Sequence, residues 1–175
     1  LEGGAAGTVV ASRFPRVVDE VRAALSSPRF RIWGSADVAG VEYAGSFKNV
    51  VAIAAGVSHA MSLGENMNSM LVTRGLSEIA TVGTKLGAAP ETFFGLAGIG
   101  DLVVTCASKH SRNHRLGVAL AQGKTLQEAV AALGQVAEGV NTARAIHEMT
   151  GASGEQPLFE RVYRVLYENL KPADA

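Results

Sequence analysis

Lys48 is the first residue whose surroundings could give it a chemical role. It lies in the segment VEYAGSFKNVVAIAAGV, where most neighbours are small or apolar and no carboxylate stands three or four residues away. A lysine in such a helix can bury its stem at the edge of the core and keep its ammonium in water. It can also be partly desolvated and then exchange protons near neutral pH. Both interpretations remain open, and the adjacent Asn49 could orient a hydroxyl or a carboxamide.

Asp101 and Thr105 form a second candidate pair. They are four residues apart, so on a helix they share one face. The glycines of the preceding segment GLAGIG let the backbone approach another group closely. Asp101 could line a reaction site or could cap the start of the helix. GLAGIG is not a dinucleotide-binding loop, because it lacks the G-x-G-x-x-G spacing and follows no predicted strand.

A group of basic side chains follows in the segment SKHSRNHRLG. The chain has 16 basic and 16 acidic residues, yet five basic ones fall within seven positions here: Lys109, His110, Arg112, His114 and Arg115. Arg112 can hold phosphate oxygens bidentately, and Ser111 and Asn113 add donors at a helix start. We therefore predict a phosphate cradle, with a solvated basic loop as the alternative. The stretch lacks aromatic side chains and the chain lacks a basic excess, which disfavours nucleic acid as a partner.

The elements that must hold these residues fall into two parts. The first reads as strand, helix and strand over residues 8–40, in TVVAS, PRVVDEVRAALSS and FRIWGS, the order found at the end of a βαβ unit. After it, strand signals vanish, and we expect helices near residues 40–62, 66–86, 98–106, 112–122, 126–133, 138–149 and 157–169. The predicted fold is mainly α, with an α/β remnant over residues 1–40 and an all-helical domain over residues 41–175.

Composition limits the class of protein. With 47% hydrophobic and 18% charged residues, the 175-residue chain can bury a sizeable core, and its longest apolar run, VVAIAAGV, is too short to span a membrane. The single cysteine, Cys106, excludes an internal disulfide and favours a reducing compartment such as the cytoplasm. We expect no metal site, because Ser111 separates His110 from His114 and no third ligand is evident. The chain does not begin with methionine and opens like mid-protein sequence, so we expect a fragment.

Several motifs together resemble one enzyme family. The segments GVEYAGSFKNVVAIAAG, LVTRGLSEI, ETFFGLAGIGDLVVTC, SRNHRLG and QVAEGVNTA occur in an order similar to that of the bacterial NAD(P)-dependent glycerol-3-phosphate dehydrogenases, from about residue 8 to 168. The resemblance implies a Rossmann domain that holds NAD or NADP. It also implies a helical substrate domain like the C-terminal domain of 6-phosphogluconate dehydrogenase. The implied reaction interconverts dihydroxyacetone phosphate and sn-glycerol 3-phosphate for glycerophospholipid synthesis.

The same resemblance implies roles for individual residues. Lys48 would be the catalytic proton acceptor and donor, with Asn49, Asp101 and Thr105 around the reacting hydroxyl. The substrate phosphate would be bound at Ser111, Arg112 and Asn113, and the cofactor would be bound by Arg112, Val136 and Glu138. A homodimer is a reasonable assembly. The glycine fingerprint of the Rossmann domain is absent from the sequence, so the chain alone should bind cofactor poorly and turn over little substrate.

Two other interpretations remain. A related two-domain dehydrogenase that acts on a non-phosphorylated substrate would have no use for the SRN segment, so Arg112 distinguishes it. A non-catalytic helical module could dock an acidic partner through its basic loop, and Lys48 would then have no chemical role.

Overall fold

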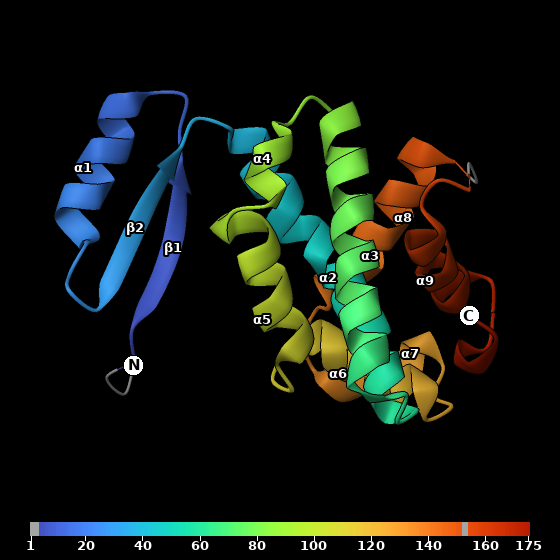
Figure 1. The fold of residues 1–175 in the computed structure, drawn as a ribbon. Coiled ribbons are helices and arrows are strands. Elements are labelled where there is room, and N and C mark those ends of the chain that lie inside the picture. Colours follow the sequence, from blue (N-terminus) through green and yellow to red (C-terminus); the bar gives the residue numbers. More distant parts are fainter. Residues whose placement is uncertain (1–3, 152–153) are drawn as a thin grey trace.

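The computed structural model describes residues 4–151 and 154–175, in which a small strand–helix–strand unit precedes a bundle of helices (Figure 1). The unit consists of β1 (Ala6–Ala11), α1 (Pro15–Leu25) and β2 (Phe30–Ser35). The bundle consists of α2 (Val38–Ala60), α3 (Gly64–Lys85), α4 (Pro90–Phe93), the π-helical turn η1 (Leu96–Gly100), α5 (Asp101–Ala107), α6 (Arg112–Ala121), α7 (Leu126–Leu133), α8 (Glu138–Thr150), α9 (Pro157–Tyr167) and the 3₁₀ turn η2 (Pro172–Asp174). The predicted mainly α fold class is confirmed.

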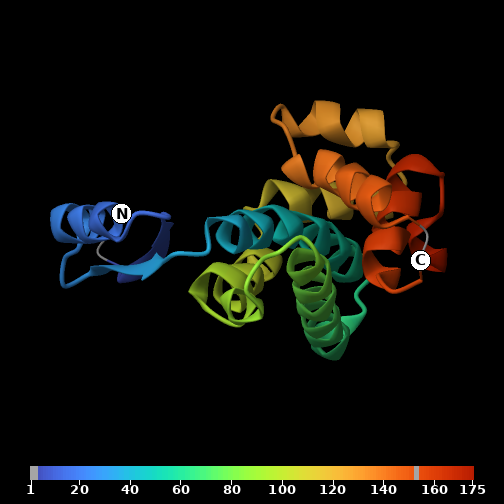
Figure 2. The same ribbon diagram turned by 90° about the horizontal axis from the view of Figure 1, so that it is seen from above.

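The N-terminal unit is a parallel two-stranded sheet with one covered face. β1 pairs with β2 from Ala6 opposite Phe30 to Ala11 opposite Ser35. Val18 of α1 and Ile32 of β2 are buried, whereas the Trp33 side chain beside Ile32 is 44% exposed. Seen from above, the unit stands apart from the bundle and joins it through a short link (Figure 2). Parallel sheets are usually covered on both faces, whereas in this unit α1 covers one face.

Helix α2 is the centre of the bundle. Its middle stretch is apolar on all sides, the pattern of a helix surrounded by protein, and Val50, Val51 and Ala52 are completely buried. Helices α3, α5, α6 and α8 all pack against it. Gly56 allows the closest of these approaches, since a Cβ there would lie 2.0 Å from the carbonyl oxygen of His114 on α6.

Asp37 fixes the beginning of α2 and joins it to α4. Its carboxylate accepts hydrogen bonds from the backbone N–H of Gly40 at 2.9 Å, from the N–H of Ala89 at 3.0 Å and from the hydroxyl of Thr92 at 2.6 Å. Desolvation by burial alone would raise the pKa of Asp37, but the hydrogen bonds from Thr92, Gly40 and Ala89 together hold it below its usual value. One side chain therefore caps two helices.

The expected start signals of later helices are present. Ser111 caps α6 by accepting a hydrogen bond from the N–H of His114, and Thr125 forms a reciprocal capping box with Glu128 at the start of α7. The segment between α3 and α5 differs from the expectation of a single helix beginning near residue 98. It contains α4 and the π-helical turn η1 instead, and α5 begins only at Asp101.

Within the described residues, no single helix is long and apolar enough to cross a membrane. The segments Pro90–Ala107 and Arg112–Ala121 meet the length and composition criteria only as a pair bent by 47°. In that pair Phe93, Leu102 and Leu116 are completely buried in the protein core, whereas Phe94, Val103 and Val104 are exposed.

Candidate active site

Lys48 of α2 and Asp101 of α5 meet across the helix interface. The Lys48 ammonium forms an ion pair and hydrogen bond with Asp101 Oδ2, and its side chain is only 19% exposed. On the other carboxylate oxygen, Asp101 Oδ1 accepts a hydrogen bond from the Thr105 hydroxyl at 3.3 Å. Asp101 is the first residue of α5 and its side chain caps no backbone group. The capping interpretation of Asp101 is therefore wrong, because its carboxylate is turned toward the lysine.

Cys106 lies in the core close to this ion pair. Burial raises the pKa of its thiol from 9.0 to about 12, and the positive charge of Lys48 offsets part of that rise. The thiol therefore stays protonated at physiological pH. It packs as a small apolar group, as expected for a cysteine without an activating partner.

The residue after Lys48 connects α2 to α8. Asn49 is buried, and its amide group donates to the carbonyl of Gly45 at 3.3 Å and to Glu138 Oε2 at 3.5 Å. The other carboxylate oxygen of Glu138 lies 3.9 Å from a guanidinium nitrogen of Arg112 at the start of α6. Glu138 thus connects Arg112 to Asn49, the residue after Lys48, and both Arg112 and Glu138 remain partly open to solvent.

Asn113 is held in place by a glycine that sequence reasoning did not single out. Its side-chain oxygen accepts a hydrogen bond from the backbone N–H of Gly139 at 3.0 Å, while the Asn113 side chain is buried. A Cβ at Gly139 would lie 2.7 Å from the Asn49 carbonyl oxygen and 2.8 Å from Asn113 Oδ1. Only glycine fits between these two groups. The sequence signal that could have identified Gly139 is its position directly after Glu138 in QVAEGV.

The remaining predicted residues lie at the edges of this group. Ser111 is the N-cap of α6, directly before Arg112. Val136 is 64% exposed, in the segment between α7 and α8. The basic stretch is divided by the helix: Arg112 and Asn113 contact residues of α8, whereas His114 and Arg115 line a separate pocket with Lys109.

An open cleft of about 460 Å³ lies beside the Lys48–Asp101 pair. It separates the strand–helix–strand unit from the bundle, and Asp101 lies on its wall together with residues of β1, α2, η1 and α5: Gly7, Thr8, Val9, Val41, Gly45, Leu96, Ala97, Gly100 and Val104. Small residues on both walls leave the backbone accessible. A flat or extended small molecule could therefore enter between the two parts and reach the lysine.

These residues could carry out a specific kind of chemistry. The amino group of a mostly buried lysine that is paired with a carboxylate can exchange a proton with the hydroxyl group of a ligand bound in the cleft. A guanidinium at a helix start, with an amide and a serine beside it, can hold a phosphate group. Each of the two cations already has a carboxylate nearby, so a ligand would replace or share these partners.

Comparison with known proteins identifies the family. Residues 37–175 match the family model described as NAD-dependent glycerol-3-phosphate dehydrogenase C-terminus. A glycerol-3-phosphate dehydrogenase of Anaeromyxobacter dehalogenans is 50% identical over 167 residues, which cover 95% of this chain and 50% of that protein. The corresponding protein of Syntrophobacter fumaroxidans is 46% identical over 183 residues, covering 98% and 54%.

Solved structures give the same result. The crystal structure of glycerol-3-phosphate dehydrogenase from Coxiella burnetii superposes with a TM-score of 0.91 at 38% identity, covering 97% of this chain and 53% of that one. The Saccharomyces cerevisiae enzyme gives a TM-score of 0.86 at 30% identity. The chain spans about half the length of the curated relatives it matches. On this evidence it belongs to the NAD-dependent glycerol-3-phosphate dehydrogenase family.

Proposed function

We propose that this chain carries the substrate-binding and proton-transfer part of an NAD(P)-dependent glycerol-3-phosphate dehydrogenase. The reaction interconverts sn-glycerol 3-phosphate and dihydroxyacetone phosphate and serves glycerophospholipid synthesis. The single observation that carries the proposal is the Lys48–Asp101 pair at an open cleft, with Arg112 connected to the same helix through Glu138 and Asn49. The relatives' shared name supports the choice of substrate.

Lys48 is the proposed proton carrier. During oxidation its nitrogen accepts the proton of the substrate's secondary hydroxyl while the carbon beneath loses a hydride, and during reduction the ammonium returns that proton to the alkoxide oxygen. Asp101 orients the lysine and balances its charge, and Thr105 fixes the carboxylate through its hydroxyl. Asn49 holds the neighbouring part of α2 against α8 and can align the reacting oxygen.

The phosphate group is proposed to bind at the start of α6. Arg112 supplies the charge, Asn113 supplies an amide, and Ser111 supplies a hydroxyl beside the first N–H groups of the helix. A non-phosphorylated substrate would leave this cation without a function. Anchoring the remote phosphate lets binding energy hold the carbonyl carbon in line for hydride transfer.

The cofactor is proposed to bind beside the SRN segment and the start of α8. NAD or NADP, when bound, supplies the hydride acceptor or donor. Arg112, Val136 and Glu138 are the proposed contacts on this chain, and their exposed positions beside the SRN segment are compatible with a large planar ligand. Glu138 offers carboxylate oxygens to hydroxyl or amide donors, and Arg112 offers its guanidinium to phosphate oxygens.

We also propose a division of labour along the chain. Residues 1–40 form part of the cofactor-binding Rossmann layer, and residues 41–175 form the substrate domain. The exposed Trp33 and the single covered face of the sheet support this division.

A cytoplasmic location agrees with the single buried cysteine. A homodimer agrees with the apolar side chains that α3 exposes, among them Met67 and Met70.

The test of the proton-transfer role is Lys48→Ala in an active context. We would join the chain to the N-terminal half of the Anaeromyxobacter dehalogenans relative, which supplies a cofactor domain. Lys48→Ala should lower kcat by at least about a hundredfold, since a positioned proton-transfer group contributes about 10²–10⁴-fold. The far-UV circular dichroism spectrum should not change.

Lys85→Ala is the matched control, because Lys85 is also paired with a carboxylate, Glu155, but on the surface. That variant should keep the parent kcat. If Lys48→Ala retains most of its turnover while Lys85→Ala behaves as expected, Lys48 does not carry the proton.

A further inference from the structure

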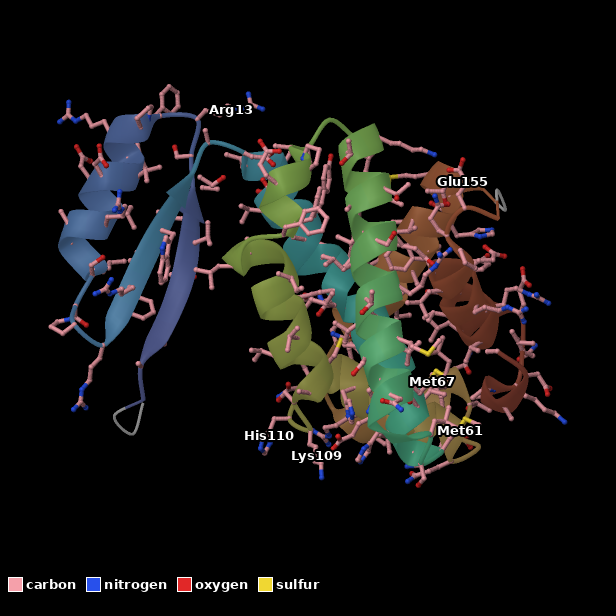
Figure 3. The ribbon with its side chains drawn as sticks, in the orientation of Figure 1. Arg13, Met61, Met67, Lys109, His110 and Glu155 are labelled. Atoms are coloured by element: carbon pink, nitrogen blue, oxygen red, sulfur yellow. The ribbon has the colours of Figure 1, made fainter. Side chains whose placement is uncertain are left out.

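A second group of basic side chains surrounds a pocket on another face of α6. The pocket has a volume of about 270 Å³ and is lined by His59 of α2, by Lys109 of the segment between α5 and α6, and by His114 and Arg115 of α6. Val118, Ala119 and Gln122 complete its wall. Figure 3 shows Lys109 and His110 at the end of the bundle where α5 leads into α6. Arg112 and Asn113 do not line this pocket, so it is separate from the proposed substrate site.

His114 is the unusual member of the group. The whole residue is only 5% exposed, and its ring makes no hydrogen bond within the described part of the chain. Its nearest aromatic neighbour is His59, with ring centroids 5.3 Å apart. The backbone of His114 is fixed, because its N–H is capped by Ser111 and its carbonyl lies against Gly56. The ring nitrogens of His114 reach solvent and lack a partner among the described residues, so they are open to a ligand in the pocket.

The charges around the pocket are all of one sign. None of the four basic side chains forms an ion pair with a described residue. Helices α2 and α7 and the turn η2 pack on α6, but Glu128 of α7 and Asp174 of η2 do not line the pocket. Burial lowers the pKa of His114, and the nearby positive charges of His59 and Lys109 lower it further. A bound anion would offset the lowering of the His114 pKa by these two positive charges.

We propose that this pocket binds a small, doubly charged oxyanion of the phosphate class, and that binding draws protons onto His59 and His114. Lys109 and Arg115 provide permanent positive charge at the rim, and the two imidazoles add positive charge when they are protonated. Each imidazole that is neutral before binding takes one proton from solvent. Binding is therefore stronger at pH 6 than at pH 8, because protonation and anion binding favour each other.

The experiment follows the ring signals of the chain's four histidines by NMR as the pH is changed between about 5 and 9. The titration is run in sodium phosphate and in sodium chloride of equal ionic strength. Phosphate should raise the titration midpoints of His59 and His114 by about one pH unit, which corresponds to about tenfold tighter binding to the protonated ring. His147 of α8 lies outside the pocket, is paired with Glu160 and serves as the internal control.

Two variants connect the effect to this pocket. Arg115→Gln removes an exposed rim charge without disturbing the core and should reduce the phosphate effect on His114 severalfold. Arg112→Ala should leave the effect intact, because Arg112 belongs to the other site. Equal shifts of all four histidines in phosphate and chloride would overturn the proposal. So would loss of the His114 response in Arg112→Ala, since the anion would then be bound at the proposed substrate site.

Discussion

Arg112 is the residue on which the proposal of a phosphorylated substrate depends. Among the described residues its guanidinium pairs only with the carboxylate of Glu138, at a loose 3.9 Å, so it is available to a second anion. Removing a charge-assisted hydrogen bond costs about 1.5–3 kcal/mol. In the chain completed with a cofactor domain, Arg112→Ala should therefore raise the KM for the phosphorylated substrate by about tenfold or more.

The control for this prediction is Arg164→Ala on α9. Arg164 is far in sequence from the residues that line the cleft, and it pairs with Glu168 on the surface. Steady-state kinetics with both variants measures the effect. An unchanged KM in Arg112→Ala would remove Arg112 from the phosphate site and favour the interpretation of a different dehydrogenase.

Cys106 predicts how stability changes in alkaline solution. The pKa of the thiol is 9.0 in the unfolded chain and about 12 in the folded one. Unfolding therefore releases a proton between these values, and the free energy of unfolding falls as the pH rises through them, by about 1.4 kcal/mol per pH unit. Cys106→Ala should lack this contribution. Urea unfolding of both proteins at several pH values above 9.0 would test it, and parallel curves would contradict it.

At the residue scale, sequence alone could indicate side-chain chemistry but not partners across helices. Lys48 could be selected because no carboxylate stands three or four residues away from it in its own helix, yet its partner Asp101 lies 53 positions away in the chain. The segment SKHSRNHRLG could be interpreted as one basic group, but in the helix Arg112 lies near Glu138 of α8 whereas His114 is buried. Gly139 was missed because its role depends on how closely α8 approaches α2.

At the element scale, Glu78 predicts a dependence of α9 on α3. This carboxylate is 2% exposed and accepts hydrogen bonds from the backbone N–H groups of Leu158 and Phe159, each at 3.0 Å, and from Arg74. It caps α9 from another helix. Glu78→Ala should lower the free energy of unfolding by about 3 kcal/mol, because it leaves buried donors without acceptors.

Urea unfolding provides the measurement. Glu78→Gln, which keeps one acceptor oxygen, should lie between Glu78→Ala and the parent. The comparison variant is Glu148→Ala on the exposed side of α8, which should change stability by less than about 0.5 kcal/mol. Equal losses for the two alanine variants would show that α9 does not rely on this carboxylate.

The elements also show where periodicity is informative and where it fails. Helices with clear N-caps, such as α6 and α7, begin and end within a residue or two of their predicted limits. The short α4 and the turn η1 were not predicted, because four or five residues cannot display a 3.6-residue period. Their positions depend on tertiary contacts instead, including the bonds from Ala89 and Thr92 to Asp37.

At the scale of the molecule, the bundle has its own core. The connected cluster of buried apolar side chains runs from Ala44 to Leu166 and excludes the buried residues of the N-terminal unit, Val18 and Ile32. A chain restricted to residues 37–175 should therefore keep its helical circular dichroism and unfold cooperatively. Its free energy of unfolding should lie within about 1 kcal/mol of that of the longer chain. Aggregation or a gradual transition of the shorter chain would contradict this.

The central position of α2 has a consequence for how the site adapts to a ligand. The backbone that bears Lys48 and Asn49 is enclosed by four other helices, so shifting it would require the whole core to be repacked. Adjustment to an incoming molecule must come from rotation of side chains and from the starts of α5, α6 and α8. The backbone that bears the lysine therefore stays in place, and a ligand must be accommodated by the side chains around it.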